Sequence, residues 1–327
     1  MIDLLPNADE QAVLDNFRSV LRAEAPVSRL REARPGDATL LPRMVELGWI
    51  GLGLSEEHGG VGYGIAEEML LFREAGRHLV SPLLLGAVLG AHVAAEAGDA
   101  DLAGAIIAGE KSVALLIRKD AKGAVLRLDG AAAPLALVWD GAGMALYDES
   151  ALSGIEDVPA LDNYVTLERA SLAGAPLLHV TSTLPVRAKI LVSAMLVGVA
   201  ESARDMAVDY AKLREQFGQP IGAFQAIKHF CADMAVRAEA AHFQTLVAGF
   251  ALHENQPDAA YQASAARIVA ADAALRNGER NIQVHGGIGY TEAADPQLFI
   301  KRAHLLAELG GGTRQHQRDI LTEQAPA

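Results

Sequence analysis

An arginine and an amide side chain stand just before a glycine- and proline-rich break in the C-terminal half of the chain. The segment Arg214–Pro220 reads REQFGQP, and Arg214 and Gln216 can both donate hydrogen bonds to a phosphate. Further along, Gln283 precedes Gly286-Gly287, whose backbone N–H groups can approach a ligand without side chains in the way. Guanidinium groups and bare amides are the donors that a pyrophosphate needs. The two segments together predict a phosphate-binding site.

Each segment also has a purely structural interpretation. Arg214 could pair with an acidic side chain at a helix end, and Gly286-Gly287 could simply form a helix C-cap. The presence of both segments, in this order and on consecutive predicted helices, favours the binding interpretation.

Long alanine-rich stretches with apolar residues at helical spacing must position these segments. Five helices are expected: Val186–Glu215, Phe224–Leu252, Asp258–Val284, Pro296–Leu309 and Thr313–Leu321. The first three are long and consecutive, which suggests an antiparallel bundle. Arg214 would then lie at the end of the first helix and Gln283 at the end of the third.

The rest of the chain divides into a helical and a strand-rich part. Helices are expected over Ala8–Ala25, Ala38–Leu47 and Ile65–Gly76. Short apolar runs between Gly/Asp turns then predict strands at Val113–Ile117, Ala124–Leu128, Leu135–Trp139, Val165–Arg169 and Leu177–Thr181. The chain is therefore expected to be mostly α with a small central β-domain. The expected domains are residues 1–110, 111–182 and 183–327.

Composition limits the partners. The 327 residues are 51% hydrophobic and only 5% aromatic, which favours helices, and the net charge is −13 with a pI near 5.2. This charge argues against nucleic acid or an anionic membrane as a partner. A local cluster of basic groups must therefore bind any anionic ligand.

The single cysteine, Cys231, excludes an internal disulfide framework and a multi-cysteine metal site, and we expect a buried, inert thiol. The histidines show no metal-ligand spacing, so no metal is expected. The apolar run Leu79–Ala95 is short for a membrane span and predicts a core helix. Residues Met1–Leu4 show no targeting signal, and a cytoplasmic location is expected.

The two binding segments resemble the flavin-binding signatures of the acyl-CoA dehydrogenase family. The segments Leu47–Gly60 and Thr313–Arg318 resemble two further motifs of that family. The resemblance implies FAD-dependent α,β-dehydrogenation of an acyl-CoA thioester. It also implies an N-terminal helical domain, a β-barrel or sheet that is reduced here, and a C-terminal four-helix bundle. The implied FAD contacts are Arg214, Gln216, Phe217, Gln283, Gly287, Thr313 and Gln315.

The catalytic glutamate of the family has no counterpart at its expected position. A carboxylate must remove the α-proton while hydride leaves the β-carbon, but the position that matches the glutamate is Gly311. An alternative family position falls near Ala188, beside Lys189. Glu308 is the nearest substitute in sequence. A solvated acid at the edge of its helix is the favoured interpretation of Glu308, ahead of a relocated base.

The β-domain departs from the family as well. The Gly/Ser/Glu loop that holds flavin and acyl-CoA is replaced by Arg118-Lys119-Asp120-Ala121-Lys122-Gly123. Trp139 lies in this region, but its neighbours do not match the family's tryptophan-containing strand. The basic residues could meet a CoA phosphate, although a solvated basic turn is favoured.

The retained residues are those that a family subunit offers to its neighbour's FAD, and the missing ones serve its own active site. The leading hypothesis is therefore an accessory subunit that shares FAD with a full-length acyl-CoA dehydrogenase partner, of the heteromeric bacterial steroid or side-chain β-oxidation type. The alternatives are a self-sufficient homo-oligomeric flavoenzyme with Glu308 as base, and a flavin-free scaffold of the same fold. The acyl group, and homodimer against hetero-oligomer, remain open.

Overall fold

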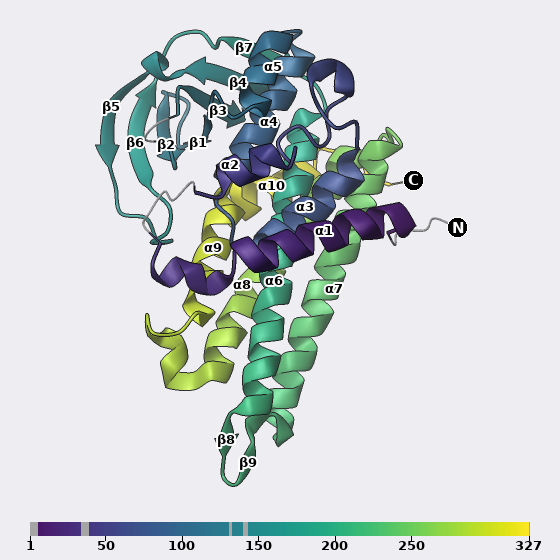
Figure 1. Ribbon diagram of the computed structural model, residues 1–327, viewed down its shortest axis with the longest axis vertical. Coiled ribbons are helices and arrows are strands. Elements are labelled where there is room, and N and C mark those ends of the chain that lie inside the picture. The colour runs from purple at the N-terminus through teal and green to yellow at the C-terminus, as the bar shows by residue number, and fades with distance from the viewer. Residues whose placement is uncertain (1–5, 34–38, 131–132, 140–142, 327) are drawn as a thin grey trace.

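The structure is a computed structural model that describes residues 6–33, 39–130, 133–139 and 143–326. The N-terminal residues Met1–Leu4 and the expected helix start at Ala38 lie outside the described residues. A β-sheet and several helices form one end of the molecule, and long helices extend from it toward a small hairpin at the other end (Figure 1).

The N-terminal part is helical, as the sequence predicts. Its α-helices are α1 (Ala8–Glu24), α2 (Leu41–Glu46), α3 (Ile65–Arg77), α4 (Leu83–Glu96) and α5 (Ala100–Ile107). Helix α1 begins with a capping box, in which the Asn7 side chain accepts from Glu10 N and the Glu10 carboxylate accepts from Asn7 N. Residues 83–95 of α4 are all buried, which confirms the core helix expected there. Among the described residues, no helix is long and apolar enough to cross a membrane.

The middle part is a seven-stranded sheet with the order β5-β6-β2-β1-β3-β4-β7. Its strands are β1 (Val113–Arg118), β2 (Ala124–Leu128), β3 (Leu135–Trp139), β4 (Gly143–Asp148), β5 (Leu152–Asp157), β6 (Leu167–Leu172) and β7 (Leu178–Thr181). Strands β1 and β3 are parallel, with Leu115 opposite Leu137, and every other pair is antiparallel. The central β-domain is thus an open sheet.

The sequence missed two strands for opposite reasons. Strand β4 is buried from Gly143 to Tyr147 and therefore shows no alternation of apolar and polar residues. Strand β5 lies at the sheet edge and is exposed after Leu152, so it has no apolar face to recognise. The expected strand over Val165–Arg169 is shifted, because β6 begins at Leu167.

Three long helices form the C-terminal bundle and confirm its prediction. They are α6 (Leu184–Leu213), α7 (Gln225–His253) and α8 (Ala259–His285), followed by the shorter helices α9 (Pro296–Glu308) and α10 (Gly312–Ile320). The break between α6 and α7 contains an unpredicted hairpin, β8 (Glu215–Gln216) and β9 (Gln219–Pro220). Cys231 on α7 is only partly buried, which corrects the expectation of a buried thiol, and this partial burial raises the pKa of the thiol.

Helix α3 packs closely against α6, so the N-terminal part contributes to the bundle core. A Cβ atom on Gly198 would lie 1.9 Å from Arg73 O, and one on Gly76 would lie 2.0 Å from Met195 O. Only glycine permits this approach of two backbones. The crossing fixes α3, and the loop before it, relative to α6.

A buried ion pair connects the strand-rich part to both helical parts. Arg302 of α9 donates from Nε to Asp162 Oδ2 at 2.5 Å and from Nη1 to the carbonyl oxygens of Leu79 and Val80. Arg302 and Asp162 are 2% and 3% exposed, so removal of either would leave a buried charge without its partner. This pair therefore holds α9 and the loop before α10 in place.

Candidate functional site

The β8–β9 hairpin presents three of the predicted FAD contacts at the far end of the bundle. Arg214 is the C-cap of α6, and Arg214, Gln216 and Phe217 are all exposed. Phe217 and Gly218 both have positive φ, at 56° and 78°, which is the type I′ geometry that suits a two-residue hairpin loop. A positive φ is strained for phenylalanine. Phe217 is nevertheless 93% exposed, so the hairpin presents an aromatic ring to the surroundings.

The end of α8 lies beside the end of α6. The rings of Tyr210 and His285 stack with centroids 4.0 Å apart. Gly286 ends α8 at φ 65° and ψ −144°, a conformation essentially restricted to glycine. Nothing lies within 4 Å of a Cβ built on Gly287, and Gln283 is exposed. The structure thus brings the first two predicted segments together as one surface with open backbone, which we call the hairpin end.

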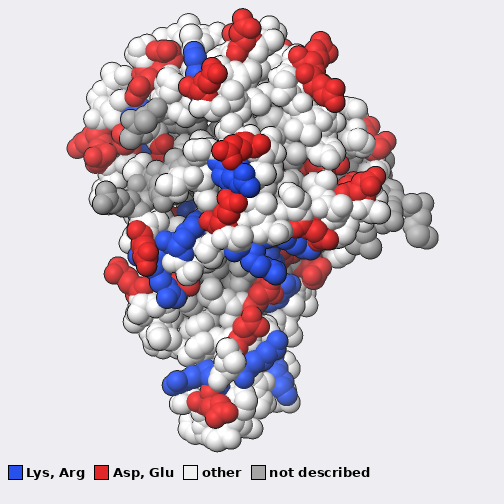
Figure 2. Space-filling view, in the orientation of Figure 1, with Lys and Arg blue, Asp and Glu red and all other residues white. Residues whose placement is uncertain are grey.

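This hairpin end can accommodate phosphates. Arg214, Gln216 and Gln283 supply exposed donors, and the backbone at Gly287 is free of steric cover. The chain is acidic overall, yet basic side chains gather at the tip of the bundle (Figure 2). The helix C-cap interpretation of Gly286 is also correct, and it is compatible with binding at Gly287.

The third predicted segment lies elsewhere. Thr313 and Gln315 belong to α10, which packs beside Arg267 of α8 through His316. Gln283 lies sixteen residues further along α8, a rise of about 24 Å. The predicted FAD contacts therefore form two separate groups on one chain.

A cavity of about 420 Å³ lies beside this second group, between the sheet and the bundle. We call it the sheet–bundle cavity. Its walls come from the end of β1 and the start of α6, together with β3, α8, and the α9–α10 connection. Ala188 and Gly311, the two positions matched to a catalytic glutamate, both line it. The structure thus places two distant sequence positions at one site.

Two carboxylates line the sheet–bundle cavity. Glu308 is exposed at the end of α9, as expected of a solvated acid. Asp319 accepts from Lys189 Nζ at 3.0 Å, and Lys189 also donates to Ser264 and Glu323. Burial opposes the charged form of Asp319, but the hydrogen bonds from Lys189 and Gln315 together with the charge of Lys189 outweigh it and lower the pKa of Asp319. Asp319 is thus held as a paired anion, which makes it a poor base.

The sequence analysis did not identify Arg267, which is 1% exposed and also lines the sheet–bundle cavity. Its Nε donates to His316 Nε2 at 3.2 Å, and its Nη2 donates to the carbonyl oxygens of Leu306, Ala307 and Leu309. Burial lowers the pKa of Arg267 to about 9. The available signal was an arginine on the small apolar face of α8, since Arg267 lies one helical turn from Ala263 and Ala270.

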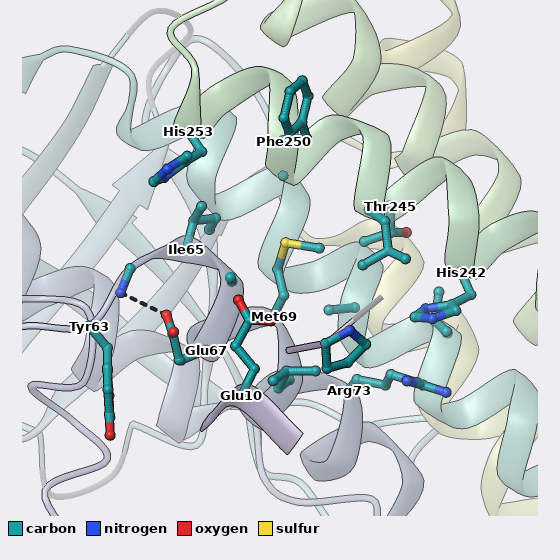
Figure 3. Close-up of a pocket in the computed structure, with 18 of the residues that line it drawn as sticks. Glu10, Tyr63, Ile65, Glu67, Met69, Arg73, His242, Thr245, Phe250 and His253 are labelled. Atoms are coloured by element: carbon teal, nitrogen blue, oxygen red, sulfur yellow. Dashed lines mark hydrogen bonds between the residues drawn. The ribbon is translucent and has the colours of Figure 1, made fainter. Parts of the chain in front are cut away.

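A second cavity, of about 390 Å³, lies between α1, α3, α6 and α7 (Figure 3). Met69 and Phe250 contribute apolar surface, and Arg73 and His242 lie together at one side. Burial, assisted by the charge of Arg73, lowers the pKa of His242 to about 4, so this imidazole is neutral at pH 7. The predicted site residues lie outside this cavity. Within the described residues, no cluster of three or more His, Cys, Asp or Glu is placed to hold a metal ion.

Comparison with known families agrees with this architecture. The acyl-CoA dehydrogenase N-terminal domain matches residues 7–107, and the acyl-CoA dehydrogenase C-terminal domain matches residues 180–325. The chain belongs to the acyl-CoA dehydrogenase family.

Individual relatives differ in how much of their length the chain spans. Acyl-CoA dehydrogenase IpdE2 of Mycobacterium tuberculosis is 30% identical over 327 residues, which cover 98% of each chain. Acyl-CoA dehydrogenase FadE34 of the same organism is 33% identical over 290 residues, which cover 84% of this chain but only 40% of FadE34. A chain of the ChsE4-ChsE5 complex from M. tuberculosis superposes with a TM-score of 0.85 at 21% identity, covering 100% of both chains. This last likeness shows the fold.

Proposed function

We propose that this chain is the accessory subunit of a heteromeric, FAD-dependent acyl-CoA dehydrogenase. A full-length partner of the same family supplies the catalytic glutamate and the pocket for the flavin ring. The observation that carries the proposal is the separation of the two groups of predicted FAD contacts, of which the exposed hairpin end is complete and the sheet–bundle cavity has Gly311 at the catalytic position.

The separation of the two groups supports a shared cofactor site. The hairpin end lies at the C-terminal end of α8, and the sheet–bundle cavity meets the same helix at Arg267, about 24 Å away. In this arrangement Arg214, Gln216 and Gln283 bind the pyrophosphate of the partner's cofactor. The exposed ring of Phe217 packs on the partner beside it. Thr313 and Gln315 occupy the corresponding position at this chain's own vestigial site.

The partner performs the chemistry in this proposal. Bound FAD supplies the hydride acceptor, and the partner's carboxylate removes the α-proton of the acyl-CoA. This chain contributes donors that hold the pyrophosphate and a surface that excludes water from it. The fold that the chain shares with the ChsE4-ChsE5 complex supports a heteromer, and the fold that it shares with the Tcur3481-Tcur3483 steroid acyl-CoA dehydrogenase supports a steroid-type or side-chain acyl substrate. We also propose that residues 1–110, 111–182 and 183–327 act as three domains.

The visible absorption spectrum of the purified chain tests this proposal. The chain produced alone in a flavin-replete host is expected to be colourless, and co-production with a full-length family member should yield a yellow complex. A chain that alone retains stoichiometric FAD, bleached anaerobically by an acyl-CoA, would contradict the accessory role.

The second candidate function is a self-sufficient enzyme in which Glu308 is the base, because Glu308 lies on the wall of the sheet–bundle cavity. The Glu308→Gln variant separates the two functions. In the accessory subunit the substitution leaves turnover of the complex within about twofold, as for an exposed residue outside the reacting site. In a self-sufficient enzyme it abolishes turnover, since the amide cannot accept the α-proton. Steady-state kinetics of the complex provide the measurement.

A further inference from the structure

The hydrogen bonds of Arg267 satisfy only part of its buried, charged guanidinium group. Its Nη2 caps the C-terminal carbonyls of α9, where a cation is favoured by the helix dipole, and its Nε donates to His316. Within the described part of the chain, Arg267 Nη1 has no hydrogen-bond partner. A buried N–H group that lacks an acceptor costs free energy, more so when it is charged.

No anion balances this cation directly. His316 accepts the bond from Nε with its Nε2, which requires a neutral imidazole, and burial together with Arg267 lowers the pKa of His316. The charge of Glu308 raises the pKa of Arg267 against the effect of burial, but no described carboxylate is hydrogen-bonded to the guanidinium. A buried cation with only dipoles around it favours a bound anion.

The sheet–bundle cavity next to Arg267 has the shape and lining of a small-molecule site. Its volume of about 420 Å³ falls within the range of ligand pockets. Trp139, Leu116 and Val192 contribute apolar surface, while Arg118 and Lys119 are exposed cations at the end of β1. The lining therefore combines apolar surface, the buried cation of Arg267, the ion pair of Lys189 with Asp319, two exposed cations and the exposed Glu308.

We propose that the sheet–bundle cavity binds a small organic carboxylate with an apolar body, whose carboxylate accepts from Arg267 Nη1. The apolar part of this ligand packs against Trp139 and Val192. A monoanion fits better than a phosphate at Arg267, because Nη1 is the one nitrogen of this guanidinium without a partner among the described residues and Glu308 repels a second negative charge. The cavity that has lost its catalytic glutamate thus becomes a binding site in its own right.

The test uses the full-length chain without flavin or partner, so its outcome is independent of the accessory role. The probes are cyclohexanecarboxylate and its neutral isostere cyclohexanecarboxamide. Binding is followed by calorimetry and by tryptophan fluorescence, since Trp139 lines the cavity and the other tryptophan, Trp49, is buried against Phe17. The carboxylate is expected to bind roughly tenfold or more tightly than the amide, as for a hydrogen bond to a charged group.

Two variants make the assignment specific. Glu308→Gln removes the repelling charge from an exposed position, and it should tighten carboxylate binding about threefold without changing amide binding. Arg267→Lys keeps a cation at the α9 carbonyls but removes Nη1, so the preference for carboxylate should disappear. Circular dichroism checks that this variant is folded. Equal affinity for the two probes, no binding of either, or no response to Glu308→Gln would overturn the proposal.

Discussion

The two ends of helix α8 differ in what they expose. At the hairpin end, the predicted donors Arg214, Gln216 and Gln283 point into open surroundings, and Phe217 holds a strained, exposed conformation. At the sheet–bundle cavity, Arg267 is buried and Lys189 is paired with Asp319, and glycine stands in place of the expected acid. The comparison teaches that the predicted FAD contacts of this one chain fall on two surfaces of different character, one open and one enclosed.

The free energy of unfolding should depend strongly on the buried charges near the sheet, and above all on the Arg302–Asp162 ion pair. Arg302→Met removes the partner of buried Asp162 and the donor to two carbonyl oxygens. We expect a loss of roughly 3–5 kcal/mol in the free energy of unfolding. Urea denaturation followed by circular dichroism measures it. A loss below 1 kcal/mol would contradict the view that this ion pair stabilises the contact between the strand-rich part and the two helical parts.

Lowering the pH should reduce the free energy of unfolding, because His242 in the bundle must become protonated. Its pKa is about 4 in the folded chain against 6.5 as an unperturbed group, so the unfolded chain binds more protons as the pH falls below 6.5. This contribution to stability is fully present above pH 6.5 and declines toward pH 4, by about 2 kcal/mol at pH 5. His242→Gln should reduce the difference in unfolding free energy between pH 7 and pH 5. If His242→Gln leaves this difference unchanged, groups other than His242 cause the loss of stability at low pH.

The smallest effect on stability is expected at the hairpin end. Phe217→Asn keeps the positive φ accessible, since asparagine tolerates this region, and it removes a ring that is 93% exposed. The free energy of unfolding of the isolated chain should change by less than about 0.5 kcal/mol. Assembly with the partner should nevertheless weaken, as size-exclusion chromatography of the co-produced complex can measure. If the variant assembles with the partner as well as the parent chain does, Phe217 is not part of the interface.

The sequence predicted those elements whose residues carry a complete local pattern. Helix α8, expected over Asp258–Val284, spans Ala259–His285 because its small apolar residues recur at helical spacing. Strand β4 could not be separated from other buried apolar runs, and exposed β5 carries no apolar face. Their assignment depends on neighbouring strands, which a local reading does not contain.

The candidate site was predictable to a similar degree. The exposure of Arg214 and Gln283 at the same end of the bundle follows from their places at the C-terminal ends of α6 and α8, since the intervening helix α7 runs in the opposite direction. Their contact with FAD stays a prediction. The sheet–bundle cavity could not be predicted, since Ala188, Arg267 and Gly311 meet only through the packing of α6, α8 and the α9–α10 connection. The importance of Arg267 lies in its missing acceptor, which is a property of the packed structure.

The flavin content of the co-produced complex carrying Arg214→Ala tests the central claim most directly. Arg214 is exposed and distant from this chain's own cavity, so it can affect FAD only through a partner. We expect FAD retention to weaken by roughly 1.5–3 kcal/mol, as for a hydrogen bond to a charged group. Arg22→Ala, an exposed arginine on α1, is the matched control and should retain FAD like the parent complex. Flavin content unchanged by Arg214→Ala would contradict the shared cofactor site.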